Sequence, residues 1–252
     1  MPGMLTDPLF YLCSIPAVLL YGIAKGGFGG PVSVLSVPLM ALVMSPTLAA
    51  AILLPILVVM DAIVVRTYWG KFDRGALKVL LPGAMLGIAL GYASAEYLNE
   101  NLMRLMIGII SLVFGLQTFL AKQGSRCSGH NPVSGSIFGA LAGFTSFSIH
   151  AGGPPFSMYL MPRGLAPLLY AGTGGVFFAA VNLVKLFPYW ALDQLPLQNL
   201  ALSAVLMPLA PLGVAIGHRL VKRSKATFYY RVISVFLVLL GVVLVWRGLQ
   251  GL

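Results

Sequence analysis

Charged residues and cysteines are both scarce in this chain of 252 residues. Charged residues make up 9% of the sequence, Asp and Glu together number 6, and there are 2 cysteines. Soluble globular proteins are about one-quarter charged, so this composition excludes a soluble fold. Cys13 and Cys127 stand far apart with no CxxC spacing. The sequence therefore predicts neither a disulfide framework nor a metal site, and we expect no cofactor.

Apolar residues fill almost the whole chain instead. Hydrophobic residues make up 59% of the sequence, and a helix needs about 20 mostly apolar residues to cross a bilayer. Long apolar runs cover residues 9–24, 31–65, 75–95, 102–121, 133–149, 165–187, 197–217 and 228–246. We therefore predict an all-α polytopic membrane protein. The N-terminal stretch MPGMLTDPLF has no basic segment before its apolar run, so we expect no cleaved signal peptide.

Three short motifs occur twice at similar spacing, which indicates an internal repeat. GGP at 29–31 recurs at 152–154, YW at 68–69 recurs at 189–190, and LGIALG at 86–91 recurs as LGVAIG at 212–217. The offset within these pairs lies between 121 and 126 residues. The chain is therefore predicted to consist of a first transmembrane repeat, 1–121, a linker, 122–132, and a second transmembrane repeat, 133–252.

Each repeat is predicted to contain a Gly/Pro-broken helical hairpin followed by three long transmembrane helices. The long helices are expected at 46–67, 75–97 and 101–121, and again at 166–187, 197–220 and 228–250. Each broken stretch is either a segment that returns to the side it entered from or two complete passes, and the sequence permits both.

Equivalent loops of the two repeats carry opposite charge. The loop after the first long helix contains Lys71 and Arg74 in the first repeat but Asp193 in the second, and the bias reverses in the next loop. Lys and Arg gather in cytoplasmic loops, so equivalent loops are expected on opposite sides of the membrane. The sequence therefore predicts two inverted-topology repeats, with the linker cytoplasmic and both termini outside.

The stretches KGGFGGP, residues 25–31, and HAGGPP, residues 150–155, concentrate helix breakers within apolar sequence. Glycine costs a helix about 1 kcal/mol relative to alanine, so both helices are expected to break here. Unpaired backbone groups are costly in hydrocarbon, and a break at membrane depth must be buried in protein or line a cavity. Prolines suit the first turn of a new helix, whose N–H groups bind anions. An anion site is therefore predicted where the two breaks meet.

Four polar side chains near the breaks are candidate substrate ligands: Lys25, His150, Asn182 and Lys185. Lys25 and His150 stand beside the two breaks, and Asn182 and Lys185 share one helix face at i and i+3. These residue types offer positive charge or hydrogen-bond donors to an oxyanion. Structural alternatives stay open: the lysines snorkel to an interface, the histidine bonds a carbonyl, and the glycines serve close helix packing.

Asp61 is an acid inside an apolar run, and aligning the two YW motifs places it opposite Asn182. An intramembrane carboxylate is a functional candidate because its burial is costly. We expect a proton exchanged at Asp61 to couple transport to the proton gradient. The alternative is a structural role, either an ion pair with Arg66 about one turn away or a hydrogen bond.

Several blocks of the sequence are similar to the sulfite exporter TauE/SafE family over residues 15–249. They are GIAKGGFGGPVSVLSVPLM, SPTLAAAILLPILVV, WGKFDRGALKVLLPGAMLGIALG and GALAGFTSFSIHAGGPP. The resemblance implies a tandem-repeat permease of the inner membrane that exports or takes up sulfite, organosulfonates or related anions. It also implies that the family's glycine blocks fall at Gly26, Gly27, Gly29, Gly30, Gly152 and Gly153. The second block departs from the family pattern in having fewer glycines, two prolines and His150.

The combined interpretation is a secondary transporter that exports sulfite or a related sulfur oxyanion by alternating access of its two halves. An anion channel and a non-transporting membrane assembly that binds a partner are the alternatives. An intramembrane enzyme is disfavoured, because the sequence has no HExxH or GxSxG motif and only one acid well inside an apolar run. The expected partners are a small anion and the lipid bilayer, with no nucleic acid.

Overall fold

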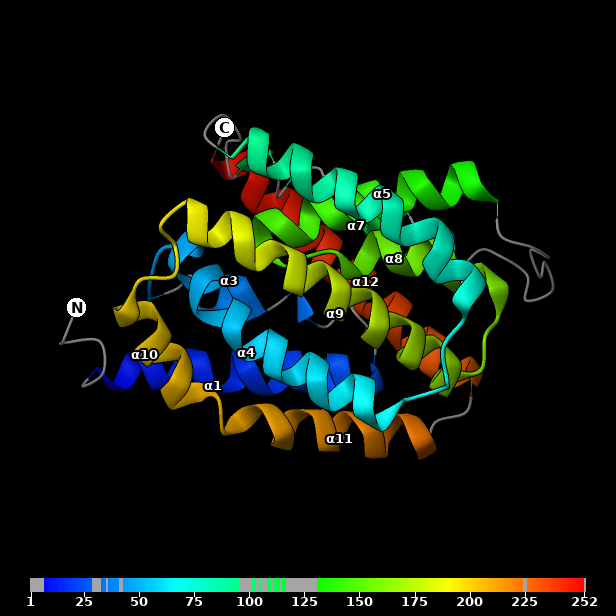
Figure 1. Ribbon diagram of the computed structural model, residues 1–252, viewed down its shortest axis with the longest axis horizontal. Coiled ribbons are helices and arrows are strands. Elements are labelled where there is room, and N and C mark those ends of the chain that lie inside the picture. Colours follow the sequence, from blue (N-terminus) through cyan, green and yellow to red (C-terminus); the bar gives the residue numbers. More distant parts are fainter. Residues whose placement is uncertain are drawn as a thin grey trace.

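The computed structural model describes residues 7–28, 33–34, 36–40, 43–95, ten positions between 101 and 116, 131–223 and 226–251. Every regular element among these residues is helical (Figure 1). Five described helices are long and apolar enough to cross a membrane. The number rises to six if one bent pair of helices forms a single span. The predicted all-α polytopic membrane fold is therefore confirmed.

The first half of the chain begins with a helix that breaks at the predicted place. Its elements are α1 (Pro8–Ile23), a π-helical turn (Ala24–Phe28), α3 (Ser36–Met40), α4 (Pro46–Thr67) and α5 (Arg74–Ala93). Side-chain caps fix three of the helix starts, because Asp7, Ser45 and Asp73 each accept a hydrogen bond from a first-turn N–H group. The long helices α4 and α5 lie where the hydrophobic pattern predicts them. The predicted helix 101–121 falls largely outside the described residues.

The second half repeats this order with one departure. Its elements are α7 (Pro132–Ile149), α8 (Gly153–Leu160), a 3₁₀ turn (Met161–Arg163), α9 (Pro167–Ala191), α10 (Leu197–Leu206), α11 (Leu209–Arg223) and α12 (Ala226–Gln250). The sequence predicts one long helix over 197–220, but the structure has two helices there, α10 and α11, which meet at an angle of 47°. Pro208 lies in the two-residue gap between them. Proline removes an intrahelical hydrogen bond, which explains the bend.

Two pairs of helices from opposite halves approach each other closely. A Cβ on Gly87 of α5 would lie 2.0 Å from the Ala140 carbonyl oxygen of α7, and one on Gly22 of α1 would lie 2.7 Å from Gly213 of α11. Glycines spaced four residues apart let the backbones touch along both pairs. The α5–α7 and α1–α11 pairs therefore join the two halves into one bundle.

Helices that the repeated sequence motifs would pair run in opposite directions in the bundle. In Figure 1, α1 and α4 begin at the left end of the view, whereas α7 and α9 begin at the right end. The YW motif that ends α4 therefore lies at the opposite end from the one in α9. Trp69 and Trp190 are 75% and 70% exposed, as expected of tryptophans at the two membrane interfaces.

Basic connections gather at one end of the bundle. The α4–α5 connection, the 3₁₀ turn after α8 and the end of α11 all lie at the right of Figure 1, and they carry Lys71, Arg163 and Arg223. The start of α1, the α9–α10 connection with Asp193 and the end of α12 lie toward the left. We call these the basic end and the opposite end.

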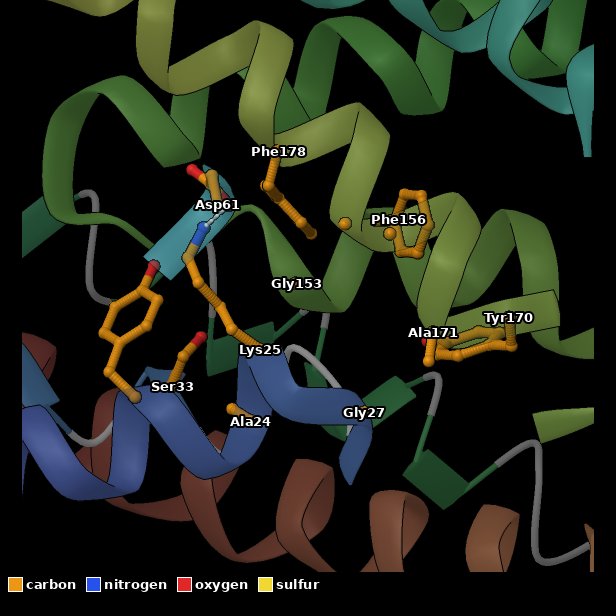
Figure 2. Close-up of a pocket in the computed structure, with 13 residues that line it drawn as sticks. Ala24, Lys25, Gly27, Ser33, Asp61, Gly153, Phe156, Tyr170, Ala171 and Phe178 are labelled. Carbon is orange, nitrogen blue, oxygen red and sulfur yellow. Dashed lines mark hydrogen bonds and ion pairs between the residues drawn. The ribbon is translucent and has the colours of Figure 1, made fainter. Parts of the chain in front are cut away.

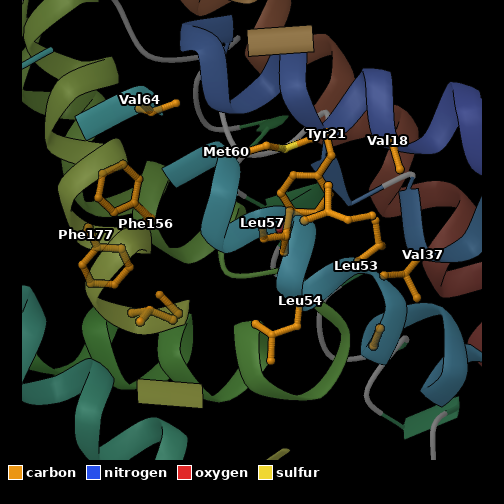
Figure 3. Close-up of a cluster of buried hydrophobic side chains, with 14 of the residues drawn as sticks. Val18, Tyr21, Val37, Leu53, Leu54, Leu57, Met60, Val64, Phe156 and Phe177 are labelled. Atoms are coloured by element: carbon orange, nitrogen blue, oxygen red, sulfur yellow. The ribbon is translucent and has the colours of Figure 1, made fainter. Parts of the chain in front are cut away.

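A dense apolar cluster, drawn from helices of both halves, runs through the bundle. Leu53, Leu54 and Leu57 of α4 have no exposed surface and pack among side chains of α1, α3, α8 and α9 (Figure 3). These leucines precede Asp61 along α4, which runs from the opposite end to the basic end. We call Leu53, Leu54 and Leu57 the leucine cluster.

Candidate functional site

The first helix break places Lys25 inside the protein. The π-helical turn after α1 contains Gly27 at φ 135°, a conformation that favours glycine. A Cβ on Gly27 would lie 2.7 Å from the Tyr68 hydroxyl, and one on Gly26 would lie 2.3 Å from the Val214 carbonyl oxygen. Both glycines therefore allow close packing around the break. Gly29 and Gly30, the other candidates from this stretch, lie outside the described residues.

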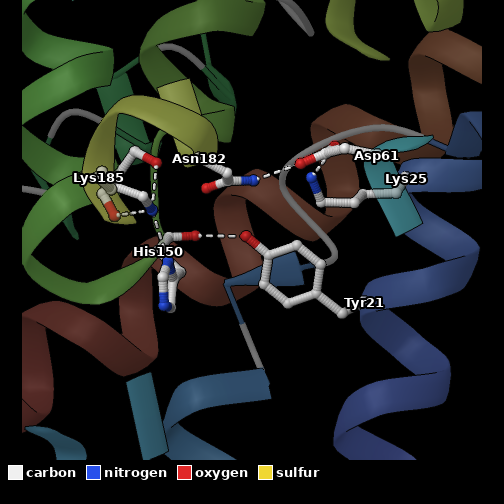
Figure 4. A network of polar contacts seen from close by, with 7 residues as sticks. Tyr21, Lys25, Asp61, His150, Asn182 and Lys185 are labelled. Atoms are coloured by element: carbon white, nitrogen blue, oxygen red, sulfur yellow. Dashed lines mark hydrogen bonds and ion pairs between the residues drawn. The ribbon is translucent and has the colours of Figure 1, made fainter. Parts of the chain in front are cut away.

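Lys25 forms an ion pair with Asp61 of α4 (Figure 4). Its ammonium group bonds to Asp61 Oδ1, while Asn182 Nδ2 of α9 donates to Asp61 Oδ2 at 2.7 Å. The candidates Lys25, Asp61 and Asn182 therefore meet in one network. The carboxylate pairs with Lys25 and not with Arg66, and Lys25 does not snorkel, because its side chain is only 7% exposed.

The second break ends α7 at Ile149 and puts His150 in the left-handed conformation, at φ 54° and ψ 29°. His150 Nε2 lies 2.9 Å from the Ala50 carbonyl oxygen, and Nδ1 lies 2.8 Å from Lys185 Nζ. A carbonyl oxygen only accepts, so Nε2 carries the proton and Nδ1 of the neutral ring accepts from Lys185. The geometry thereby fixes the tautomer.

Lys185 is held entirely by neutral acceptors. Its ammonium group donates to the Ser146 carbonyl oxygen at 2.8 Å, to Ser146 Oγ at 3.2 Å and to His150 Nδ1 at 2.8 Å. These three bonds use all three donors of an ammonium group. Lys185 has no exposed surface. It therefore points into the bundle and does not snorkel to the interface marked by Tyr189 and Trp190.

The buried charges do not balance among the described residues. Lys25 and Lys185 are both inside the bundle, whereas Asp61 is the one acid of the described membrane-spanning helices. The other described acids stand at helix ends or in a connection: Asp7, Asp73 and Asp193. The described interior therefore carries one positive charge more than negative charge when all three groups are ionised.

A pocket opens beside the Lys25–Asp61 pair (Figure 2). Its polar wall contains Lys25, Asp61, Ser33 and Gly153. Phe156 and Phe178 form part of its apolar wall.

The pocket leads toward the basic end. Ala171 at the start of α9 lines it, and a Cβ on the next residue, Gly172, would lie 1.9 Å from the Lys71 carbonyl oxygen. Neither His150 nor Lys185 lines the pocket. The structure therefore divides the predicted ligands between the pocket and a separate buried cluster.

Helix α8 begins at the pocket, as the GGPP sequence predicts, but it offers fewer donors than expected. Pro154 and Pro155 occupy its first turn and have no N–H group. The Phe156 N–H is bonded to the Gly152 carbonyl oxygen at 3.2 Å. Only the amides of Gly152 and Gly153 can therefore donate from this turn, and the lysines supply the stronger attraction for an anion.

Comparison with protein families places the whole chain. Residues 14–244 match the family model described as sulfite exporter TauE/SafE. The chain belongs to the sulfite exporter TauE/SafE family. No curated protein and no solved structure matches it. Membership and the spanning helices make this a multi-pass protein of a TauE/SafE membrane transporter family. No group of three His, Cys, Asp or Glu that could hold a metal occurs within the described part of the chain.

Two tyrosines of this TauE/SafE member were missed as site residues. Tyr68 Oη donates to the Gly26 carbonyl oxygen at 2.5 Å, and Tyr189 Oη donates to the Phe147 carbonyl oxygen at 2.8 Å. Each bond satisfies a carbonyl at the broken end of a helix. Tyr189 lies 121 residues after Tyr68, and Phe147 lies 121 residues after Gly26. The repeated YW motif was the available signal, because its tyrosines end equivalent helices.

Tyr21, Ser146 and His218 complete the polar network. Tyr21 Oη donates to the His150 carbonyl oxygen at 3.1 Å, and Ser146 binds Lys185. His218 Nδ1 lies 2.9 Å from Tyr68 Oη. Burial raises the pKa of the Tyr68 phenol, so this hydroxyl stays protonated and donates to Gly26. His218 therefore donates to Tyr68 from Nδ1.

Proposed function

We propose that the protein is a secondary transporter that exports sulfite, or a related small oxyanion or organosulfonate, across the inner membrane. The observation that carries this proposal is the charge count of the described interior, where Lys25 and Lys185 face a single carboxylate, Asp61. An unpaired charge away from water costs several kcal/mol. A bound anion removes that cost, so the site favours a negatively charged substrate.

The pocket suits a sulfur oxyanion with or without an organic group. Lys25, Ser33 and the Gly153 amide supply donors around the polar wall. Phe156 and Phe178 supply an apolar surface on which the carbon chain of an organosulfonate can pack.

Alternating access between two inverted repeats is the transport mechanism that fits this arrangement. Helices α4 and α9, which we take as equivalent, run in opposite directions, and the Tyr68–Gly26 and Tyr189–Phe147 bonds recur at one offset. The pocket leads to the basic end, which we place in the cytoplasm by the positive-inside rule. The leucine cluster precedes Asp61 on α4 and lies on the side of the site that faces the opposite end. If the pocket closed toward the basic end while the leucine cluster opened, a bound anion would be carried across the membrane.

Asp61 gives the transporter a means of proton coupling. Its carboxylate forms an ion pair with the Lys25 ammonium group, and the substrate needs the same ammonium group. A proton on Asp61 weakens that pair and frees Lys25 for the anion, so proton and anion bind favourably together. A transporter built in this way moves one proton in the same direction as each anion, so the outward anion gradient drives export against the inward proton gradient.

Proteoliposomes test the proposed function directly. Purified protein should catalyse saturable exchange of radiolabelled sulfite or organosulfonate, and Lys25→Met should abolish it while Lys78→Met, on an exposed part of α5, should not. In an anion channel, by contrast, substrate on the far side of the membrane would not accelerate the flux of labelled anion. Absence of both flux and ligand-dependent thermal stabilisation across a sulfur-oxyanion panel would favour the non-transporting assembly.

A further inference from the structure

We propose that Lys185, His150 and Ser146 form a second oxyanion-binding position, in series with the Lys25 pocket and reached from the opposite end. This inference rests on the proposed transport function and deepens it. The sequence predicts a single site that holds all the ligands. The structure separates them, with Asn182 and Tyr21 lying between the two lysines (Figure 4).

The cluster around Lys185 has the chemistry of an anion site but holds no negative charge. Three neutral acceptors use the three ammonium donors, and no described carboxylate contacts the group. Charge-assisted bonds to an anionic oxygen are roughly twice as strong as bonds to neutral acceptors. An oxyanion that displaced the Ser146 and His150 acceptors would therefore improve the environment of Lys185.

The repeat offset relates this cluster to the pocket. At 121 residues, Lys25 corresponds to Ser146, and Asp61 corresponds to Asn182. The two lysines come from different elements. Lys25 lies in the first break itself, whereas Lys185 lies on α9, the long helix beside the second break. The two cations lie on either side of the Asp61–Asn182 hydrogen bond.

The walls beside the two lysines explain why one is open and the other closed. Gly174, Gly175 and Phe178 of α9 line the pocket. At the same offset on α4, their places are taken by Leu53, Leu54 and Leu57, the leucine cluster. His150 is also tied to this part of α4 through the Ala50 carbonyl oxygen. Separation of α4 from the second break would therefore expose Lys185 toward the opposite end.

The anion would then pass between two cations and never leave a positively charged partner. It binds first at Lys25, while Asp61 is protonated, and then at Lys185 after the leucine cluster has opened. When the anion has moved on, Asp61 can pair again with Lys25. The two positions are thus occupied in different conformations of the protein.

Cysteine accessibility tests the order and sidedness of these positions. In a Cys13→Ser/Cys127→Ser background, single Ser146→Cys and Ala171→Cys variants are treated with a charged, membrane-impermeant thiol reagent in spheroplasts and in inside-out vesicles. We expect Ala171→Cys to react from the basic end and Ser146→Cys from the opposite end. Sulfite at ten times its dissociation constant should slow both reactions about tenfold. Ser148→Cys, two residues along α7, is the matched control that sulfite should not protect.

Combination with Lys185→Met separates the second position from the pocket. We expect this substitution to remove sulfite protection at Ser146→Cys and to retain it at Ala171→Cys. Leu53→Cys provides the same readout if Ser146→Cys does not fold. Reaction of Ser146→Cys from the basic end, or no reaction from either face in a variant that still transports, would overturn the second position. If sulfite protected neither cysteine in the protein that retains Lys185, sulfite would instead be refuted as the substrate.

Discussion

Asp61 Oδ2 accepts a hydrogen bond of 2.7 Å from Asn182 Nδ2, and the two residues are separated by 121 positions, the offset of the repeated YW motif. Residues that occupy the same place in two symmetric units contact each other only on the axis that relates the units. The bond thus indicates where a pseudo-two-fold axis would pass. On such an axis, one half of the chain would carry a carboxylate and the other its neutral isostere.

Loss of Lys25 alone should destabilise the protein more than joint loss of Lys25 and Asp61. Lys25→Met leaves a buried carboxylate without its cation, and loss of one partner from a buried pair costs about 3–5 kcal/mol. We expect the single variant to melt at a lower temperature than the parent in detergent. Lys25→Met/Asp61→Asn should recover most of the stability without recovering transport. Equal melting temperatures for the single and double variants would show that the pair does not stabilise the fold.

The two tyrosines that cap the broken helices should be needed for both stability and transport. Tyr68→Phe and Tyr189→Phe each leave a helix-end carbonyl unsatisfied, at a cost of about 1–3 kcal/mol. Tyr68→Phe should be the more harmful, because His218 also loses its acceptor. Melting temperature and initial sulfite flux measure the two effects. Tyr92→Phe is the control, since Tyr92 is 41% exposed and should tolerate the change; a loss of the same size there would remove the role assigned to the caps.

Close packing of the two halves predicts a strong difference between two glycines. A Cβ on Gly87 would lie 2.0 Å from the Ala140 carbonyl oxygen, whereas one on Gly174 would lie 3.3 Å from a carbon of the Phe156 ring. Overpacking against backbone costs about 1–3 kcal/mol or more, but a side chain can move aside. Gly87→Ala should therefore lower the melting temperature clearly, and Gly174→Ala should change it little. The reverse order would contradict the close contact between α5 and α7.

Much of the fold could be predicted from the sequence because it depends on local chemistry. Apolar run length and the glycine breaks place α4, α5, α9 and both helix interruptions near their observed positions. The bend between α10 and α11 was missed, although Pro208 was visible. A proline in an apolar run is compatible with either a straight or a broken membrane helix, depending on what packs around it.

The site was predicted less completely because its key contacts are long-range. Sequence spacing offered Arg66 as the partner of Asp61, only five residues away, whereas the fold supplies Lys25 from another helix. Lys185 lies near a YW motif that marks an interface, yet α7 provides it with Ser146 and His150. Periodicity identifies which residues are costly to bury, but tertiary packing decides which of them meet.

Proton coupling at Asp61 should be visible in the pH dependence of anion binding. The probe is an organosulfonate, whose own charge stays constant between about pH 5 and 8, so that changes in affinity report the protein. If a proton on Asp61 accompanies the anion, the affinity of the parent protein should rise by up to tenfold for each unit by which the pH falls, until Asp61 is fully protonated in the free protein. Asp61→Asn leaves Lys25 permanently available and should bind with little pH dependence, while still exchanging sulfonate across a liposome membrane. The histidines, which also titrate in this pH range, are the same in both proteins, so the difference between the two pH profiles isolates Asp61. Parallel profiles would show that another group, or none, carries the proton.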